Sequence, residues 1–388
     1  MRQFLAKEWQ DEETNPLMTV TGKAKLYPDI IDFSIGDPDL PVPAEILEKA
    51  GADALAGYTK YSDPWGYPEL RDAIVRFYAE DYGVSIGREN VFVTTAGCAA
   101  MSLVMEAVLE QGDEVLLFDP YFSAYDQQVR IPGGVPVCVP CLEEENWQPS
   151  AERAAQYLTP RTKALLINTP NNPTGVCYSD ETLAALARFA EEHDLLVIAD
   201  DIYTSFVYGG AKFVPIMSLP GMARRTVTVN SFSKNFVMTG LRVGNIVAPA
   251  DICRAVKRIN DSMIYSAPSY SQRAALYALE KRHAYAKQIV PEFEKRMMYG
   301  AKRIRSIPAF TLSPAAGGIY LFPGIKKTGL TSMQVCERIL DEAHVLMVPG
   351  SAFGDAGEGY LRIACTVGVD KMAEAFDRME KMPLLQLK

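Results

Sequence analysis

The chain is poor in histidine and tryptophan, with three of each among 388 residues. The three histidines are His193, His283 and His344, which are far apart in the sequence and lie in helical patterns or at their ends. We expect them at the surface, so neither a metal site nor a histidine-based general base is predicted. A proton-transferring group must therefore be sought among other side chains.

Cysteine shows no functional pattern. The seven cysteines, an odd number, are scattered without a disulfide framework, which is typical of a reducing compartment. Cys138 and Cys141 form a C-x-x-C pair, but they flank Val139-Pro140 in an expected strand and no second pair follows. Ordinary core or surface thiols are therefore favoured over a redox or zinc site.

Long apolar and long basic runs are both missing. No stretch of about twenty apolar residues occurs, so no membrane-spanning helix is expected. The net charge is −9 without a basic run, which argues against a nucleic-acid partner. The first residues lack the apolar core and small-residue cleavage site of a signal peptide. We predict a cytoplasmic protein without membrane or nucleic-acid partners.

What the chain does have is length and a substantial apolar content. At 388 residues, of which 48% are hydrophobic, it predicts a globular protein of two or three domains with a large core. Short apolar runs alternate with helical patterns from about residue 44 to 249, which suits an α/β sheet buried on both faces. Strands are expected at 91–95, 114–118, 135–139, 164–168, 195–199, 226–229 and 243–247, with helices at 98–109 and 179–193.

The pattern changes after residue 271. A long helical stretch runs past residue 301 and is expected to break or kink at Pro291, because proline lacks the backbone donor. Strands at 317–322, 345–348 and 360–364 are expected around a helix at 332–342 and a last helix from Asp370. This part of the chain predicts a second, smaller α+β domain.

Polar side chains follow three of the expected strands where each ends. Asn172 comes after the strand at 164–168, Asp200 and Tyr203 after that at 195–199, and Lys234 after that at 226–229, with Arg242 further on. The carboxyl ends of strands in an open α/β sheet are where such proteins hold ligands. An amine, a carboxylate and several donors form the set that pyridoxal 5'-phosphate (PLP) requires.

The motifs Asn168-Thr-Pro-Asn-Asn172-Pro-Thr-Gly175, Asp200-Asp-Ile-Tyr203 and Ser231-Phe-Ser-Lys234, followed by Arg242, carry a family resemblance. The chain resembles the fold-type I, PLP-dependent class I/II aminotransferases of the aspartate/alanine/aromatic group from about Ile31 to the last helix. The resemblance implies a large domain, residues 44–285, with a mostly parallel sheet between helices. It also implies a small α+β domain, residues 286–388, which residues 1–43 join.

The resemblance gives the central residues their roles. Lys234 would be the Schiff-base lysine and the proton shuttle. Asp200 would pair with the pyridine nitrogen. The family's pattern, an aspartate three residues before a tyrosine, selects Asp200 over Asp201, and because adjacent side chains of a strand face opposite ways, only one of the two should face the coenzyme. Tyr203 and Asn172 would donate to the phenolic oxygen, and Phe122, with Tyr121 as its rival, would stack on the ring.

The remaining expected positions concern the phosphate and the substrate. The resemblance implies a phosphate held at a helix start and by hydroxyls and a guanidinium, with a tyrosine lent by the partner of a homodimer. These residues are Gly97, Cys98, Ala99, Ser231, Ser233, Arg242 and Tyr61. Arg362 would bind the substrate's α-carboxylate near Gly36 and Asn172. No second arginine for a distal carboxylate is evident, and Trp65, Tyr265 and Tyr320 either line an apolar pocket or pack in the core.

The expected reaction moves the amino group of an L-amino acid to a 2-oxo acid by a ping-pong route through pyridoxamine phosphate. One alternative is another PLP reaction on the same scaffold, such as a C–S β-lyase, because fold does not fix function. Another is a catalytically silent PLP-binding regulator. Such a regulator brings a DNA-binding domain, for which the first forty or so residues are too short and too acidic.

Overall fold

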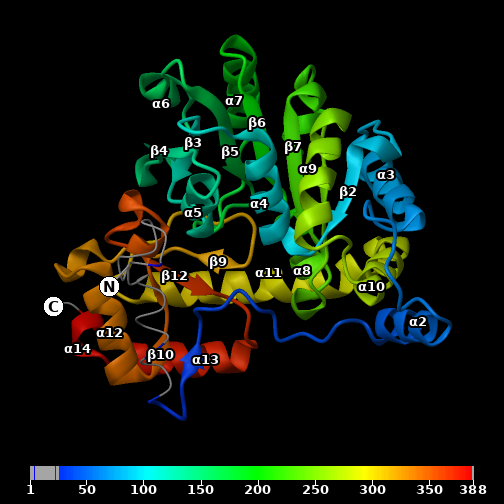
Figure 1. Ribbon diagram of the computed structural model, residues 1–388. Helices are drawn as coiled ribbons and strands as arrows, with labels where there is room; N and C mark the ends of the chain where they lie inside the picture. Colours follow the sequence, from blue (N-terminus) through cyan, green and yellow to red (C-terminus); the bar gives the residue numbers. More distant parts are fainter. Residues whose placement is uncertain (1–3, 5–21, 23–25, 387–388) are drawn as a thin grey trace.

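The computed structural model describes residues 4, 22 and 26–386, and a seven-stranded sheet dominates it (Figure 1). The strand order is β2-β8-β7-β6-β5-β3-β4. Only β8 runs antiparallel to its neighbours, so the expected mostly parallel α/β sheet is confirmed. The strands are β2 (Val91–Thr94), β3 (Glu114–Asp119), β4 (Val135–Pro140), β5 (Thr162–Asn168), β6 (Leu196–Asp200), β7 (Thr226–Ser231) and β8 (Gly244–Val247).

Helices cover both faces of this sheet because its strands are apolar on both sides. In β6, Ile198 belongs to a core shared with one set of helices, whereas Val197 and Ala199 belong to a core on the opposite face. The first face is covered by α4 (Ala96–Val108), α5 (Ala124–Arg130) and α9 (Ala250–Met263). The second is covered by α3 (Pro68–Tyr82), α6 (Ala151–Ala154), α7 (Asp180–Glu192) and α10 (Ser269–Glu280), and α2 (Ala44–Leu55) packs against α10.

Helix α7 begins where the sequence predicts it. Ser179 is its N-cap, and the Ser179 hydroxyl accepts a hydrogen bond of 3.1 Å from the backbone N–H of Thr182. Such a cap satisfies one of the free donors of the first turn and is worth about 1 kcal/mol.

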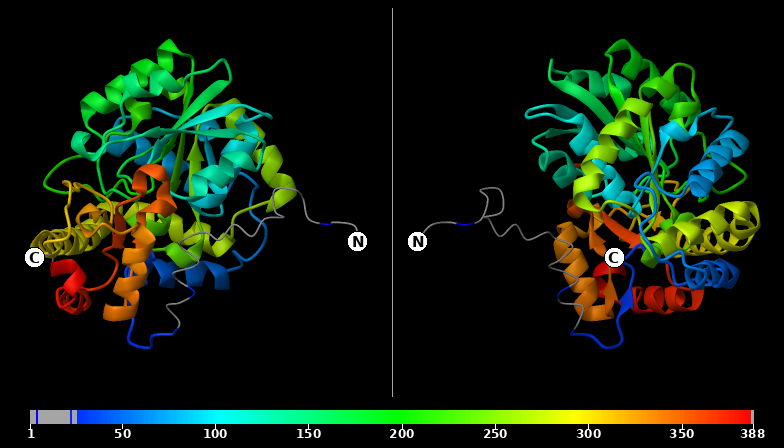
Figure 2. Two further views of the ribbon diagram at one scale, coloured as in Figure 1. Left: turned by 90° about the vertical axis from the view of Figure 1, so that its left-hand side faces the viewer. Right: turned by 45° about the vertical axis from the view of Figure 1, so that its right-hand side comes forward.

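The rest of the chain forms two small sheets. Strand β1 (Ile31–Asp32) runs parallel to β10 (Val345–Leu346), and β11 (Val348–Pro349), β12 (Leu361–Ala364) and β9 (Tyr320–Leu321) form an antiparallel sheet. The strand expected at 345–348 is therefore two strands with different partners. Helices α12 (Ser332–Ala343), α13 (Val369–Met379) and α14 (Pro383–Gln386) pack around them, below the large sheet in both views of Figure 2.

The domain boundaries at residues 43 and 285 stay predictions. The pairing of β1 with β10 supports the idea that the N-terminal segment joins the small domain. Within that segment, residues 1–3, 5–21 and 23–25 lie outside the described part of the chain.

Of the two alternatives expected at Pro291, the helix break is wrong and the kink stays a prediction. The chain leaves helical geometry at Lys281, where φ is −116° and ψ is 21°, and α11 (Arg282–Ser306) then continues through Pro291. Proline removes one backbone donor, and the carbonyl that loses it belongs to Lys287, an exposed residue open to water.

Neither membrane-spanning helices nor disulfides are found in the described residues. None of the helices there is both long and apolar enough to cross a membrane. All seven cysteines carry free thiols, and of the C-x-x-C pair Cys138 is exposed whereas Cys141 is buried.

Candidate active site

A cavity of about 620 Å³ opens at the carboxyl ends of β5, β6 and β7. Its lining includes every predicted site residue except Ala99 and Tyr61. The sheet brings these residues together because parallel strands end at one edge. The predicted residues that line it are Gly36, Gly97, Cys98, Phe122, Asn172, Asp200, Tyr203, Ser231, Ser233, Lys234, Arg242 and Arg362.

Lys234 lies on a one-turn helix, α8 (Phe232–Asn235), directly after β7. The hydroxyl of Ser231 caps this turn by accepting a 3.2 Å hydrogen bond from the N–H of Ser233. The half-buried amine of Lys234 donates to the carbonyl oxygen of Gly36, so the N-terminal segment closes over the lysine. The amine is thereby aimed into the cavity.

Asp200 is a buried carboxylate at the end of β6. Burial raises its pKa to about 6, although the hydrogen bond from the hydroxyl of Tyr125 acts in the opposite direction. A cation bound beside it would restore the charged form. The neighbouring Asp201 does not line the cavity, and its charge acts on Tyr78 and Tyr82 of α3, on the other face of the sheet.

Tyr203 and Asn172 both line the cavity. The hydroxyl oxygens of Tyr203 and Tyr320 are 3.0 Å apart, and burial raises the pKa of Tyr203 well above its usual value. Asn168 positions both motifs: its amide donates to the carbonyl of Asp200 at 2.9 Å and its oxygen accepts the N–H of Asn172 at 2.8 Å. One side chain thus connects the ends of β5 and β6.

Arg362 is a buried guanidinium on β12, 5% exposed. It donates to the carbonyl of Ser34 and, at 3.3 Å, to the side-chain oxygen of Asn172. Its Nε has no hydrogen-bond partner within the described part of the chain. The rings of Tyr320 and Phe353 each lie 4.8 Å from the guanidinium carbon. A buried cation that lines the cavity suits an anionic ligand.

The start of α4 offers a second place for an anion. Thr95 precedes the helix and makes no side-chain cap, so the first backbone N–H groups have no such partner. Ala96 takes a left-handed φ of 67°, and a Cβ on Gly97 would lie 2.8 Å from Cδ1 of Ile202. The exposed Arg242 lines the same cavity and donates a 2.7 Å hydrogen bond to the carbonyl of Thr239. These groups fit a phosphate, and with Lys234 and Asp200 the whole donor set fits PLP.

Two predicted residues lie elsewhere. Ala99 follows the cavity-lining part of α4 without lining the cavity itself. Tyr61 is 85% exposed and packs edge-on against Tyr265 at 5.2 Å. Tyr61 was expected to bind the phosphate in the site of the partner chain of a homodimer. A single chain does not test this role, which stays a prediction.

Sequence reasoning did not assign several lining residues. Asn168, the last residue of β5, stood in a quoted motif and could have been found from its place at a strand end. Tyr125 and Phe353 carry no local signal because tertiary structure brings them to the cavity. Of the three aromatic residues suggested for an apolar pocket, Tyr320 lines the cavity and Trp65 packs on Phe92 instead.

A lysine on a turn after a strand, a buried carboxylate and two anion sites at one edge of a mostly parallel sheet define a fold-type I enzyme of the PLP class. Residues 28–379 match the family described as aminotransferase class I and II. The chain belongs to this family of PLP-dependent aminotransferases.

Named relatives and a solved structure agree with this assignment. The chain is 39% identical to the aromatic-amino-acid aminotransferase 2 of Thermococcus litoralis, with 91% of each chain covered. It is 34% identical to an aspartate aminotransferase of Pyrococcus horikoshii, with 92% of each covered. The crystal structure of an aromatic aminotransferase from P. horikoshii superposes with a TM-score of 0.89 at 37% identity, covering 93% of this chain and 98% of the other.

Proposed function

We propose that this chain holds PLP through Lys234 and moves the amino group of an L-amino acid with an aromatic side chain to a 2-oxo acid. The route is a ping-pong exchange in which the coenzyme carries the amino group between the two substrates. The observation that carries the proposal is the cavity that combines Lys234, Asp200 and Arg362 at one sheet edge.

The residues that would hold the coenzyme fall into groups, according to the part of PLP that each would contact. Asp200 would keep the ring nitrogen cationic, Tyr203 and Asn172 would donate to the phenolic oxygen, and Phe122 would pack on the ring. The phosphate would take the start of α4, including the backbone of Ala99, together with Ser231, Ser233 and Arg242. When bound, PLP supplies an electron-accepting ring and a carbon that carries the amino group.

Lys234 would also move the proton. Its amine lies in the cavity beside the carbonyl of Gly36, which can hold it near the substrate's Cα. An amine placed there can take the proton from Cα and deliver it elsewhere on the same face. Arg362, which lines the same cavity, would hold the α-carboxylate with its guanidinium and so orient Cα toward that amine.

The preference for an aromatic donor follows from the lining. Lys234, Arg242 and Arg362 are its only lysines and arginines in the described residues, and each already has a role. No further cation of this chain remains there for a distal carboxylate. Aromatic side chains of Tyr203, Tyr320 and Phe353 line it instead. The relatives are named for aspartate or for aromatic amino acids, so their names do not decide the amino donor. The lining of the cavity supports an aromatic donor.

We further propose a cytoplasmic homodimer. Tyr61 is exposed and lies outside its own chain's cavity, which is compatible with its reaching the phosphate of a second copy. The free thiols support a reducing compartment.

The test is a single-turnover screen. The holoenzyme is mixed with one amino acid at a time, and conversion of its coenzyme absorbance to the amine form is followed. We expect faster conversion with L-phenylalanine or L-tyrosine than with L-aspartate. A preference for L-aspartate would contradict the substrate class, whereas no conversion with any amino acid would contradict transamination itself.

Arg362 gives the matched variant test. Arg362→Gln should lower kcat/KM for L-phenylalanine by about 30-fold or more, since losing one partner of a buried charge pair costs roughly 2–5 kcal/mol. Arg258→Gln, at an exposed position on α9, is the control and should change little. Equal activity of the two variants would remove Arg362 from the site.

A further inference from the structure

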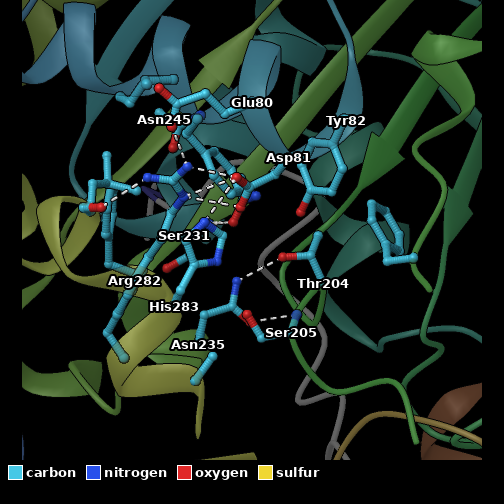
Figure 3. A pocket seen from close by; sticks show the side chains of 18 of the residues that line it. Glu80, Asp81, Tyr82, Thr204, Ser205, Ser231, Asn235, Asn245, Arg282 and His283 are labelled. Atoms are coloured by element: carbon cyan, nitrogen blue, oxygen red, sulfur yellow. Dashed lines mark hydrogen bonds and ion pairs between the residues drawn. The ribbon is translucent and has the colours of Figure 1, made fainter. Parts of the chain in front are cut away.

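A second cavity, of about 530 Å³, adjoins the turn that carries Lys234 (Figure 3). Neighbouring residues of that turn face different cavities: Lys234 lines the active-site cavity, whereas Asn235 lines the second one. The same division occurs on the segment after β6, where Tyr203 lines the first cavity and Thr204 the second. Close packing therefore does not support these two segments on the side of the second cavity.

Asn235, a buried residue that is 6% exposed, joins the two segments. Its side-chain nitrogen donates a 2.8 Å hydrogen bond to the hydroxyl of Thr204, and its side-chain oxygen accepts a 3.1 Å hydrogen bond from the N–H of Ser205 (Figure 3). Both partners directly follow Tyr203, whereas Asn235 ends the turn after β7. One amide thus connects the ends of two neighbouring strands, β6 and β7.

This contact extends the arrangement that Asn168 begins. Asn168 connects the ends of β5 and β6 through the carbonyl of Asp200 and the N–H of Asn172. Asn235 connects β6 to β7 in the same manner, with one donated and one accepted hydrogen bond. The two amides together join the three strand ends that carry the predicted coenzyme ligands.

The turn that carries Lys234 needs such anchoring. It is a helix of four residues, α8, and a helix of one turn is not stable by itself. The hydroxyl of Ser231 caps its start, and the rings of Phe232 and Phe236 stack on each other with their centroids 5.7 Å apart. Asn235 adds the polar contacts that fix the turn against the neighbouring strand end.

We propose that Asn235 is a positioning residue that holds the Lys234 turn in place relative to Tyr203. This inference rests on the proposed roles of Lys234 in proton transfer and of Tyr203 as a donor to the coenzyme's phenolic oxygen. Both groups must be placed correctly against one coenzyme, and a displacement of about 1 Å can lower a rate by roughly 100-fold. Asn235 does not line the active-site cavity, so it acts through its neighbours.

The variant Asn235→Ala removes both hydrogen bonds, and the single-turnover reaction tests it. The amino acid used is L-phenylalanine or L-aspartate, whichever the wild type converts faster, so an error in the substrate class does not affect the test. The limiting rate should fall about tenfold or more, because Lys234 moves the proton. The concentration that gives half this rate should change less than about threefold, because Arg362 lies on β12.

A second readout does not depend on activity. Displacement of the Lys234 turn relative to Tyr203 weakens donation to the phenolic oxygen, which destabilises the deprotonated coenzyme. The spectroscopic pKa of the lysine-bound coenzyme should therefore rise in Asn235→Ala. Absorbance titration of the holoenzyme measures this pKa.

Thr204 supplies a matched pair of variants. Thr204→Val keeps the shape and removes the hydroxyl, so it should also lower the limiting rate, whereas Thr204→Ser keeps the hydroxyl and should stay within about twofold of the wild type. In an Asn235→Ala background, Thr204→Val should have a smaller effect, because the two side chains share one contact. The pair also keeps the test valid if Asn235→Ala does not fold.

Asn90→Ala controls for the loss of an amide elsewhere. Asn90 likewise donates to a carbonyl, that of Ala248 at 2.9 Å, and accepts a 3.0 Å hydrogen bond from the N–H of Gly87. It directly precedes β2 and lines neither cavity. Its loss should change neither the limiting rate nor the spectroscopic pKa.

An unchanged limiting rate or an unchanged spectroscopic pKa in Asn235→Ala would overturn the proposal. Equal activity of the two Thr204 variants would overturn it as well, and so would a higher half-saturating concentration at an unchanged limiting rate. Failure of the proposed function would appear separately, in the wild type, as no conversion by any amino acid or no borohydride label on Lys234.

Discussion

At the scale of single residues, the pair of hydroxyls formed by Tyr203 and Tyr320 connects the predicted coenzyme site to the second small sheet. Tyr203 follows β6, Tyr320 begins β9, and their hydroxyl oxygens are 3.0 Å apart. If Tyr203 donates to the coenzyme's phenolic oxygen, its own oxygen is free to accept from Tyr320. A donor that itself accepts a hydrogen bond is polarised and donates more strongly. Tyr320 is therefore a positioning residue for Tyr203.

The substitution Tyr320→Phe should raise the spectroscopic pKa of the lysine-bound coenzyme. Weaker donation from Tyr203 destabilises the deprotonated coenzyme, and a neutral hydrogen bond is worth about 1 kcal/mol, so the rise should stay below about one pKa unit. Absorbance titration of the holoenzyme measures it, and Tyr265→Phe, outside the cavity, serves as control. An unchanged or lowered pKa in Tyr320→Phe would exclude this role.

At the scale of secondary structure, the start of α4 shows how one helix terminus serves the site. The helix has no side-chain cap and begins with the left-handed Ala96, so its free donors point into the cavity. Position 97 has no room for a side chain, because a Cβ on Gly97 would lie 2.8 Å from Cδ1 of Ile202, which lines the same cavity. An anion at this position would replace the missing cap.

The substitution Gly97→Ala should weaken coenzyme binding while leaving the chain folded. The added methyl group must displace Ile202, which lines the same cavity. An overpacking cost of roughly 1–3 kcal/mol, where the bound state bears it, corresponds to a loss of about 5- to 150-fold in affinity. Equilibrium dialysis of PLP against the apoenzyme measures the dissociation constant. Gly51→Ala, on α2, where a Cβ meets nothing within 4 Å, should bind like the wild type. Equal affinities would show that the phosphate lies elsewhere.

Motifs at strand ends explain why much of the site could be predicted from the sequence. Lys234, Asp200 and Asn172 each follow an apolar strand within a few residues, and a parallel sheet brings such ends together. Strand alternation predicted that only one of Asp200 and Asp201 faces the cavity, and the family's spacing of aspartate and tyrosine selected Asp200. The contributions of Tyr125 and Phe353 could not be foreseen, because they come from elements whose docking depends on long-range packing.

Element boundaries were less predictable. The strand expected at 345–348 is two strands, because β10 pairs with β1 whereas β11 pairs with β12. These pairings depend on segments that are distant in the sequence. The helix break lies at Lys281 and not at Pro291, since one missing donor on an exposed face is tolerated. Local pattern does not show either effect.

At the scale of the whole molecule, Asp119 links the large sheet to the segment before β12. It ends β3, is 3% exposed and accepts a 3.1 Å hydrogen bond from the N–H of Ala356, while its Oδ1 has no partner in the described residues. Burial raises its pKa to about 6, with the charge of Asp355 adding to the rise and the Ala356 bond opposing it. The junction therefore contains a carboxylate that is costly to ionise.

The substitution Asp119→Asn should remove a pH dependence of stability. The folded pKa of about 6 exceeds the reference value of 3.8, so the protonated form stabilises the fold below about pH 4, and this contribution is lost as the pH rises to about 6. The loss is about 3 kcal/mol at 1.36 kcal/mol per pKa unit. Relative to wild type, the variant should gain stability between pH 4.5 and pH 7.

Urea-unfolding midpoints at the two pH values measure this gain. Glu48→Gln, which removes an exposed carboxylate from α2, is the control and should follow the wild type. If Asp119→Asn had the same urea-unfolding midpoints as the wild type at both pH values, the pKa of the Asp119 carboxyl would not be raised by folding.

The account depends most on the covalent bond between PLP and Lys234. Borohydride reduction of the purified protein, followed by proteolysis and mass spectrometry, tests it directly. We predict a phosphopyridoxyl label on the peptide that contains Lys234, and no such label in Lys234→Ala. A label on another lysine, or a protein that stays colourless and unlabelled with added coenzyme, would contradict the account.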